Sequence, residues 1–363
     1  MHVALGRVYL QQGQRERARS QFEAASKDPL DYEGACALGR LLLSLGLPDL
    51  ALEPLTRAVA RNGFHGEARD ALGRTLLALG RGPEALKQFE AWQLDNPGEA
   101  RAQRGFALAL LHTGRLAEAQ AAADRAVKLS PADPETHRLR AVLAFRTGDA
   151  RAGFAALERS NKLDPHSAET FCEIAHAFGR QGNATGAQKA FEAARREGPE
   201  ATCGQVGEHW ALLPEGGGRA AARTLQQLYA KAPSTWERAF AQAALARVLL
   251  DAGALKEARA AAQEAVRLDP HSGRSHLALG LVALRQRDEA AATAALQRAA
   301  ELEPADGPVR LALADALSRS DAEAARAVSE YETFLQLAGE APEAARVQKA
   351  LPALKRRLVA VGR

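Results

Sequence analysis

The feature that most constrains how this chain can fold is a repeat of 34 residues, marked by proline and glycine. The residues at this spacing are Pro97, Pro131, Pro165, Pro199 and Pro233, and Gly46, Gly80, Gly114, Gly148, Gly182 and Gly216. After three inserted residues, Pro270 and Pro304 resume it. Because a fixed period of about 20 to 50 residues indicates stacked copies of one supersecondary unit, we expect a repeat architecture.

Each period has the pattern of a helical hairpin. Apolar residues recur at spacings of three and four on both sides of the glycine, as they do on one face of a helix. Glycine supplies the left-handed conformation that ends the first helix, and proline, which lacks an N–H, stops the second helix. Hydrophobic residues make up 47% of the chain and aromatic residues only 5%, which favours closely packed helices. The sequence therefore predicts an all-α fold.

Residues at fixed positions in the repeat resemble the tetratricopeptide repeat (TPR) family. The third repeat shows the pattern as Leu72, Gly73, Leu76, Gly80, Ala85, Phe89 and Pro97. Similar sets occur in the first and sixth repeats: Leu5, Gly6, Tyr9, Gly13, Ala18, Phe22, Ala25 and Pro29, and Ala175, Phe178, Gly182, Ala187, Phe191, Ala194 and Pro199. The resemblance implies a right-handed superhelical solenoid of about ten TPR hairpins with a C-terminal capping helix, in which the first helix of each hairpin lines a concave groove.

The period divides the chain into four segments. Residues 1–201 hold repeats one to six, and residues 239–341 hold repeats eight to ten. Between them, residues 202–238 form a divergent seventh repeat with the insertion. Residues 342–363 carry an apolar stripe that predicts a capping helix on the last repeat.

The seventh repeat departs from the pattern in its first helix. Gly204 and Gly207 each cost a helix about 1 kcal/mol relative to alanine, and Pro214 closes it early. The insertion, near residues 234–236, follows directly. Two interpretations stay open: the segment is a hinge or ligand site, or it is a decayed repeat that its neighbours tolerate.

Two cysteines and two histidines lie in the same zone. Cys172 and His176 are four residues apart on one helical face, and Cys203 and His209 follow one repeat later. Four such side chains are able to hold zinc, but the close spacings typical of zinc sites are absent. We therefore expect no metal and no cofactor, with buried or groove-lining cysteines. Three cysteines, an odd number, predict no disulfide framework.

Arginines dominate the positions that the resemblance assigns to the groove. The candidate peptide-binding residues are Arg7, Arg40, Arg74, Arg101, Arg104, Arg138, Arg146, Arg180, Arg247, His176 and Trp210. Arg274 lies on the same track. Guanidinium groups suit the carboxylates of an acidic peptide segment. The alternative is that acidic neighbours such as Glu67 and Asp70 pair with these arginines and cancel their field.

The remaining sequence features narrow the function classes. No phosphate-binding loop, HExxH or GxSxG motif occurs, so we expect no catalysis. The net charge of +4 is modest, and the groove has few aromatic residues on which bases could stack (Phe145, Trp210, Phe240), which makes nucleic acid a weaker partner. We expect an interaction scaffold or assembly adaptor with one or more protein partners, or else the TPR portion of a larger enzyme or secretion machine.

Location and completeness are further expectations. No run of about 18 apolar residues predicts a transmembrane helix. Residues 1–20 have the pattern of a repeat whose first helix lacks its opening residues, so we expect a fragment of a longer protein. The few cysteines favour the cytoplasm, and the periplasm stays open if a signal sequence lies outside this fragment.

Overall fold

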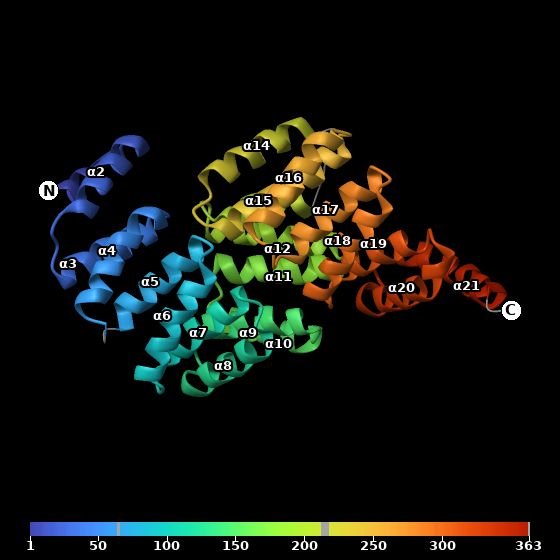
Figure 1. The fold of residues 1–363 in the computed structure, drawn as a ribbon, viewed down its shortest axis with the longest axis horizontal. Helices are drawn as coiled ribbons and strands as arrows, with labels where there is room; N and C mark the ends of the chain where they lie inside the picture. The colour runs from blue at the N-terminus through green and yellow to red at the C-terminus, as the bar shows by residue number, and fades with distance from the viewer. Residues whose placement is uncertain (64–65, 212–217, 362–363) are drawn as a thin grey trace. The chain divides into compact units, whose positions relative to one another are not determined.

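The computed structural model describes residues 1–63, 66–211 and 218–361, and all regular secondary structure in these ranges is helical (Figure 1). The first helices of the successive hairpins are α1 (His2–Gln11), α3 (Tyr32–Ser44), α5 (Gly66–Ala78), α7 (Ala100–His112), α9 (Pro134–Thr147), α11 (Ala168–Arg180), α13 (Thr202–Ala211), α15 (Thr235–Asp251), α17 (Gly273–Arg285) and α19 (Gly307–Leu317).

The second helices complete the hairpins. They are α2 (Arg15–Lys27), α4 (Pro48–Arg61), α6 (Gly82–Asp95), α8 (Leu116–Leu129), α10 (Ala150–Leu163), α12 (Ala184–Glu197), α14 (Gly218–Lys231), α16 (Leu255–Leu268), α18 (Glu289–Leu302) and α20 (Ala324–Ala338). A short 3-10 helix, η1 (Asp321–Glu323), precedes α20, and α21 (Ala344–Val361) packs on α20 through buried Val347 and Leu354. The predicted all-α hairpin solenoid is confirmed.

The predicted turn and packing roles of glycine are also present. Gly80 and Gly182 adopt φ angles of 73° and 69° at the hairpin turns, where only a residue without Cβ is unstrained. A Cβ added to Gly73 would overlap the ring of Phe89, which is fully buried. The small residue therefore lets the two helices of the hairpin cross closely, and the large one fills the space beside them.

The chain forms two compact units: an N-terminal unit of residues 1–131 with 233–235, and a C-terminal unit of residues 132–232 with 236–363. Repeats one to four lie in the N-terminal unit, and repeats five to ten lie almost entirely in the C-terminal unit. None of the helices in the described ranges has both the length and the apolar character needed to cross a membrane.

The seventh repeat continues the core of the C-terminal unit. A Cβ on Gly207 would overlap Phe191, and one on Gly204 would approach the backbone nitrogen of Arg195 to 3.0 Å. These glycines let α13 pack tightly on α12, so they have a packing role that offsets their low helix propensity. Val206 of α13 is fully buried in the same apolar cluster as Phe191. Pro214 lies outside the described residues.

The insertion lengthens the next helix. The first helix of repeat eight, α15, has 17 residues, whereas α11 and α17 have 13. Arg238 in its first turns donates from Nε to the carbonyl of Ala232, six residues earlier, at 3.0 Å. His276 and Arg310 make the same backward bond in repeats nine and ten. The extra residues are thus absorbed as about one helical turn, after which the period resumes.

Candidate binding surfaces

In the N-terminal unit, the first helices of neighbouring repeats contact one another in sequence: α3 with α5, and α5 with α7. Together with α1, these helices carry six arginines against three carboxylates, all within the ranges described. We call five of these arginines the N-terminal arginine face: Arg7, Arg40, Arg74, Arg101 and Arg104. The excess of positive charge makes this face suited to anionic groups.

Ion pairs between neighbouring repeats organise this face. Arg40 of α3 donates to Glu67 of α5 at 2.7 Å, and both side chains are more than half exposed, at 57% and 59%. Asp70 is buried and accepts from Arg74 at 3.3 Å and from Arg101 at 2.9 Å. Acidic neighbours therefore do pair with the predicted arginines. Because exposed pairs contribute only about 0 to 1 kcal/mol, such a pair is readily exchanged for one with a ligand.

The two other predicted residues on this face lie at its ends. Arg7 is exposed on α1, and Arg104 is half-buried on α7. The arrangement leaves guanidinium surface accessible along four consecutive first helices. Exposed guanidinium groups are able to form bidentate bonds with carboxylates, and Asp70 already anchors two of these arginines.

In the C-terminal unit, the predicted arginines are buried or half-buried. Arg180 of α11 is only 5% exposed and donates from Nε to Oε2 of Glu303 at 3.1 Å. Arg146 of α9 donates from Nη1 to the carbonyl of His271 at 2.6 Å. The residues that meet here are the C-terminal polar cluster: Arg146, His176, Arg180, Arg274, Glu303 and Asp306. Helix α11 contacts α19, which begins directly after Asp306.

Aromatic rings pack against two guanidinium groups of the cluster, those of buried Arg180 and half-buried Arg274. The Cζ of Arg180 lies 4.9 Å from the ring centroid of Phe145, and that of Arg274 lies 5.4 Å from Phe240. Arg274 also donates to Nε2 of His176 at 3.2 Å. Both phenylalanines are buried, so neither provides the exposed stacking surface that a nucleic-acid site would need.

Burial and charge set the protonation states of the cluster. Burial raises the pKa of Glu303, but the charges of Arg180, Arg146 and Arg274 together outweigh it and hold the pKa at about 2. Burial, and then the charge of Glu303, raise the pKa of Asp306 to about 7. Burial and the two nearby arginines lower the pKa of His176 well below its ordinary range. Near neutral pH, Glu303 is therefore charged and His176 is neutral.

Close backbone approach makes the cluster possible. A Cβ on Gly307, the first residue of α19, would stand 3.0 Å from the carbonyl oxygen of Arg180. A Cβ on Gly273 would overlap the side chain of Glu303. Asp306 caps α19 by accepting from the Val309 N–H at 2.9 Å. Glu303 and Asp306 were absent from the predicted site because they lie between helices, and their only sequence signal is the cap pattern before α19.

The zinc hypothesis is wrong for the cysteine pair. Cys172 of α11 and Cys203 of α13 form a disulfide with their Cα atoms 6.2 Å apart, so neither is a free thiolate ligand. No group of three suitable ligands occurs among the residues that the structure describes. The sequence predicted no disulfide framework, and the structure shows this single disulfide between two buried cysteines that neighbouring first helices bring together. Cys36 is free and buried.

The remaining predicted site residues are Arg138, Arg247, His209 and Trp210. Arg138 on α9 and Arg247 on α15 are half-buried. The side chains of His209 and Trp210 lie outside the described residues. The structure thus separates the predicted arginines into a mostly exposed set in the N-terminal unit and a buried or half-buried set in the C-terminal unit.

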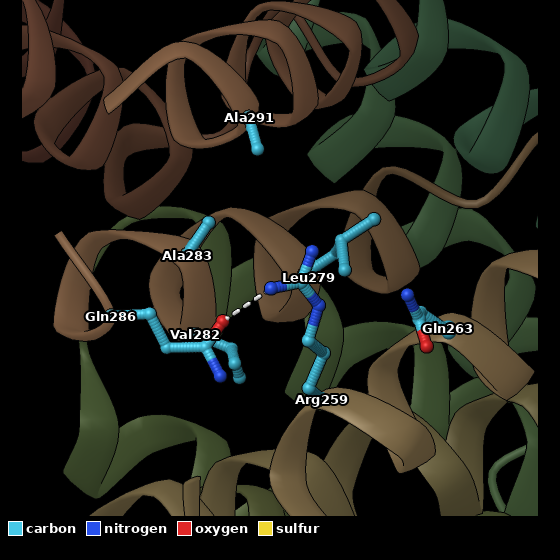
Figure 2. A pocket seen from close by; sticks show the side chains of 7 residues that line it. All are labelled: Arg259, Gln263, Leu279, Val282, Ala283, Gln286 and Ala291. Atoms are coloured by element: carbon cyan, nitrogen blue, oxygen red, sulfur yellow. Dashed lines mark hydrogen bonds between the residues drawn. The ribbon is translucent and has the colours of Figure 1, made fainter. Parts of the chain in front are cut away.

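A separate hollow opens between α16, α17 and α18 (Figure 2). Its volume is about 110 Å³, and its lining residues are Arg259, Gln263, Leu279, Val282, Ala283, Gln286 and Ala291. Arg259 donates to Gln286 at 2.9 Å across it. Because small-molecule pockets usually have volumes of about 300 Å³ or more, this hollow does not suit a metabolite or cofactor.

Comparisons with known proteins agree with this architecture. A family model described as a tetratricopeptide repeat matches residues 3–66, 71–134, 105–168, 210–272 and 243–307, which together cover more than half of the chain. A search of curated protein sequences finds no match.

Several solved structures are similar. A chain of the APC/C hetero-tetramer Cut9-Hcn1 aligns with a TM-score of 0.58 and 14% identity, over 84% of this chain and 60% of that one. TTC0263, a thermophilic TPR protein of Thermus thermophilus, gives a TM-score of 0.48 and 22% identity, over 51% of this chain and 100% of that one. Yeast Tom70 gives a TM-score of 0.37 and 13% identity, over 98% of this chain and 95% of that one. The Cut9-Hcn1 similarity concerns the fold alone.

Proposed function

Because the chain belongs to the tetratricopeptide repeat family, whose members are generally interaction scaffolds without catalytic activity, we propose that it is a protein-interaction scaffold or assembly adaptor. We place its ligand on the N-terminal arginine face and infer an acidic peptide segment of a partner protein. The chain spans 60% of the length of the Cut9-Hcn1 chain that it matches. A role as the TPR portion of a larger enzyme or secretion machine is a separate alternative to this proposal.

The observation that supports this most is the exposure of the Arg40–Glu67 pair. Both side chains are more than half exposed, and the bond joins two repeats without being buried in either. A ligand carboxylate that replaces Glu67 therefore costs little desolvation, since the arginine is already in contact with water. Arg101, half exposed beside Asp70, offers the next donor along the face.

Charge reversal on this face tests the proposal. Partners are first captured from a lysate and identified by mass spectrometry, and the acidic segment of the partner is then titrated into the purified chain. We expect Arg40→Glu with Arg74→Glu to weaken binding strongly, and added salt to weaken the wild-type complex.

The matched control is Arg81→Glu with Arg115→Glu, which makes the same charge change at two partly exposed ion pairs at the starts of α6 and α8, outside the first helices. If this control weakens binding equally, the binding depends only on net charge. Binding that ignores both reversals removes the arginine face from the proposal.

A further inference from the structure

The bond between Arg180 and Glu303 joins repeats that are not neighbours. Arg180 ends the first helix of repeat six, whereas Glu303 caps the second helix of repeat nine, 123 residues later. Each repeat of a solenoid is held by contacts with its immediate neighbours. The contact is therefore additional to what the stacking requires, and it can open while every hairpin stays folded.

The carboxylate of Glu303 forms a hydrogen bond with only one nitrogen of the Arg180 guanidinium group. Glu303 Oε2 accepts from Nε of Arg180 at 3.1 Å, while Nη1 of Arg180 is buried and has no hydrogen-bond partner among the described residues. A carboxylate that is free to orient itself binds a guanidinium fork through two parallel bonds. The site thus has donor capacity that its present occupant leaves unused.

Neighbouring side chains fix the guanidinium groups of Arg180 and Arg274 in positions that suit an anion. Phe145 lies under Arg180 and Phe240 under Arg274, and neutral His176 accepts from Arg274. Arg146 adds a third positive charge that acts on Glu303. Preorganised, desolvated arginines of this kind favour a planar anionic partner over water.

We propose that Arg180 and Arg274 form a carboxylate-binding site which the chain occupies from within: Glu303 is its resident ligand, and an acidic segment of a partner protein binds by displacing it. Glu303 thereby acts as a latch, meaning an internal side chain that must leave before the ligand binds. This inference goes beyond the function proposed for the N-terminal arginine face and does not depend on it.

Asp306 makes the latch sensitive to pH, because it is buried and its N–H donates to the carbonyl of Glu303 at 3.1 Å. The charged groups acting on it are Glu303 from the end of α18, Arg180 from α11 and Arg274 from α17. When Asp306 is protonated, Glu303 is the only one of the two that carries a negative charge. Without its proton, it adds a second buried negative charge beside Glu303, and like charges in a buried site repel strongly. The latch therefore loosens as Asp306 ionises.

Chemical rescue tests the binding site directly. Glu303→Ala removes the resident carboxylate, and acetate is then added as a probe carboxylate. We expect the melting temperature of this variant to rise with acetate more than with chloride at the same ionic strength. The control is Glu301→Ala, which removes an exposed carboxylate from the same helix. If acetate raises the melting temperature of both variants equally, the proposed carboxylate-binding site is refuted.

Glu303→Gln covers the case in which the alanine variant does not fold, because it keeps the shape of the side chain. The variant is made in a background of Arg40→Glu and Arg74→Glu, so that the N-terminal arginine face plays no part, and a labelled short polyglutamate peptide is titrated. We expect affinity to increase about tenfold, the change expected from removing one charge-assisted bond that competes with the ligand. Adding Arg180→Ala should abolish the gain, and an affinity unchanged by Glu303→Gln refutes the latch.

Discussion

The arginines of the two units come from equivalent first helices but have different environments. In the N-terminal unit, Arg40 is half exposed and bonds to Glu67 of the next repeat. In the C-terminal unit, Arg180 is almost completely buried and bonds to Glu303 three repeats away. The difference teaches that a position in the repeat fixes which helix face a residue occupies, whereas contact with distant repeats decides whether that face is surface or interior.

The largest expected effect comes from breaking the buried pair. Arg180→Ala should lower the free energy of unfolding of the C-terminal unit by about 3 to 5 kcal/mol, because it leaves Glu303 buried without its bonded partner. Arg40→Ala should cost the N-terminal unit no more than about 1 kcal/mol, because its pair is exposed. Urea denaturation of the full chain measures both. Equal losses would erase the distinction between the two surfaces.

The disulfide gives a second way to separate the units. Cys172 and Cys203 close a loop of 31 residues in the C-terminal unit, whereas Cys36 in the N-terminal unit is free. Reduction should destabilise the C-terminal unit by about 3 kcal/mol, because the unfolded chain regains the entropy of the open loop. Calorimetry with and without a phosphine reductant checks this, with the double alanine variant of the pair as control. A reductant effect that persists in that variant has another origin.

A third prediction concerns pH. The folded pKa of Asp306 is raised to about 7, above its unfolded value of 3.8, so its contribution to stability is present at low pH and is lost as the pH rises through about 7. His176, whose pKa is lowered, acts in the opposite sense by losing stability as the pH falls below 6.5. The difference in stability between Asp306→Asn and wild type isolates the contribution of Asp306 from that of His176.

Asp306→Asn keeps a helix-capping side chain but cannot ionise. Its stability relative to wild type should therefore increase between about pH 5 and about pH 8. Thermal melting across this range measures the difference. A difference that does not vary with pH would mean that Asp306 is ionised throughout and does not govern the latch.

The smallest effect concerns one hairpin turn. Arg287 occupies the turn position of repeat nine with φ of 61°, whereas Gly253 occupies it in repeat eight with φ of 76°. Arg287→Gly should stabilise the C-terminal unit by about 0.5 to 1 kcal/mol, because the left-handed conformation strains a side chain. Gly253→Ala, which has open space around it, should lose a similar amount. Denaturant titration of both variants compares them, and two changes of the same sign would contradict the backbone explanation.

Much of the fold could be predicted from the sequence because the 34-residue period depends on contacts between residues that are close in the chain. The turn glycines, the crossing at Gly73 and the filling role of Phe89 all follow from contacts within one hairpin or with the next. The extra turn of α15 could not be read from the insertion, because three residues fit a loop or a helix equally well. The number and position of hairpins required no long-range information.

The site was only partly predictable for the opposite reason. Arg40 and Arg180 were both found by their positions in the repeat, but their exposure depends on which distant repeats approach them. Glu303 reaches Arg180 only because Gly307 and Gly273 permit close packing. The cysteine pair likewise becomes visible only when neighbouring first helices are placed side by side.

The central claim is that the arginines of the N-terminal unit are open to a ligand while those of the C-terminal cluster are covered by the chain itself. Phenylglyoxal, which modifies accessible arginines, tests it when the modified residues are located by mass spectrometry over time. We predict rapid modification of Arg40, Arg74 and Arg101 and protection of Arg180 and Arg274 until Glu303 is replaced. Modification of Arg180 in the wild type as fast as that of Arg40 would contradict the account.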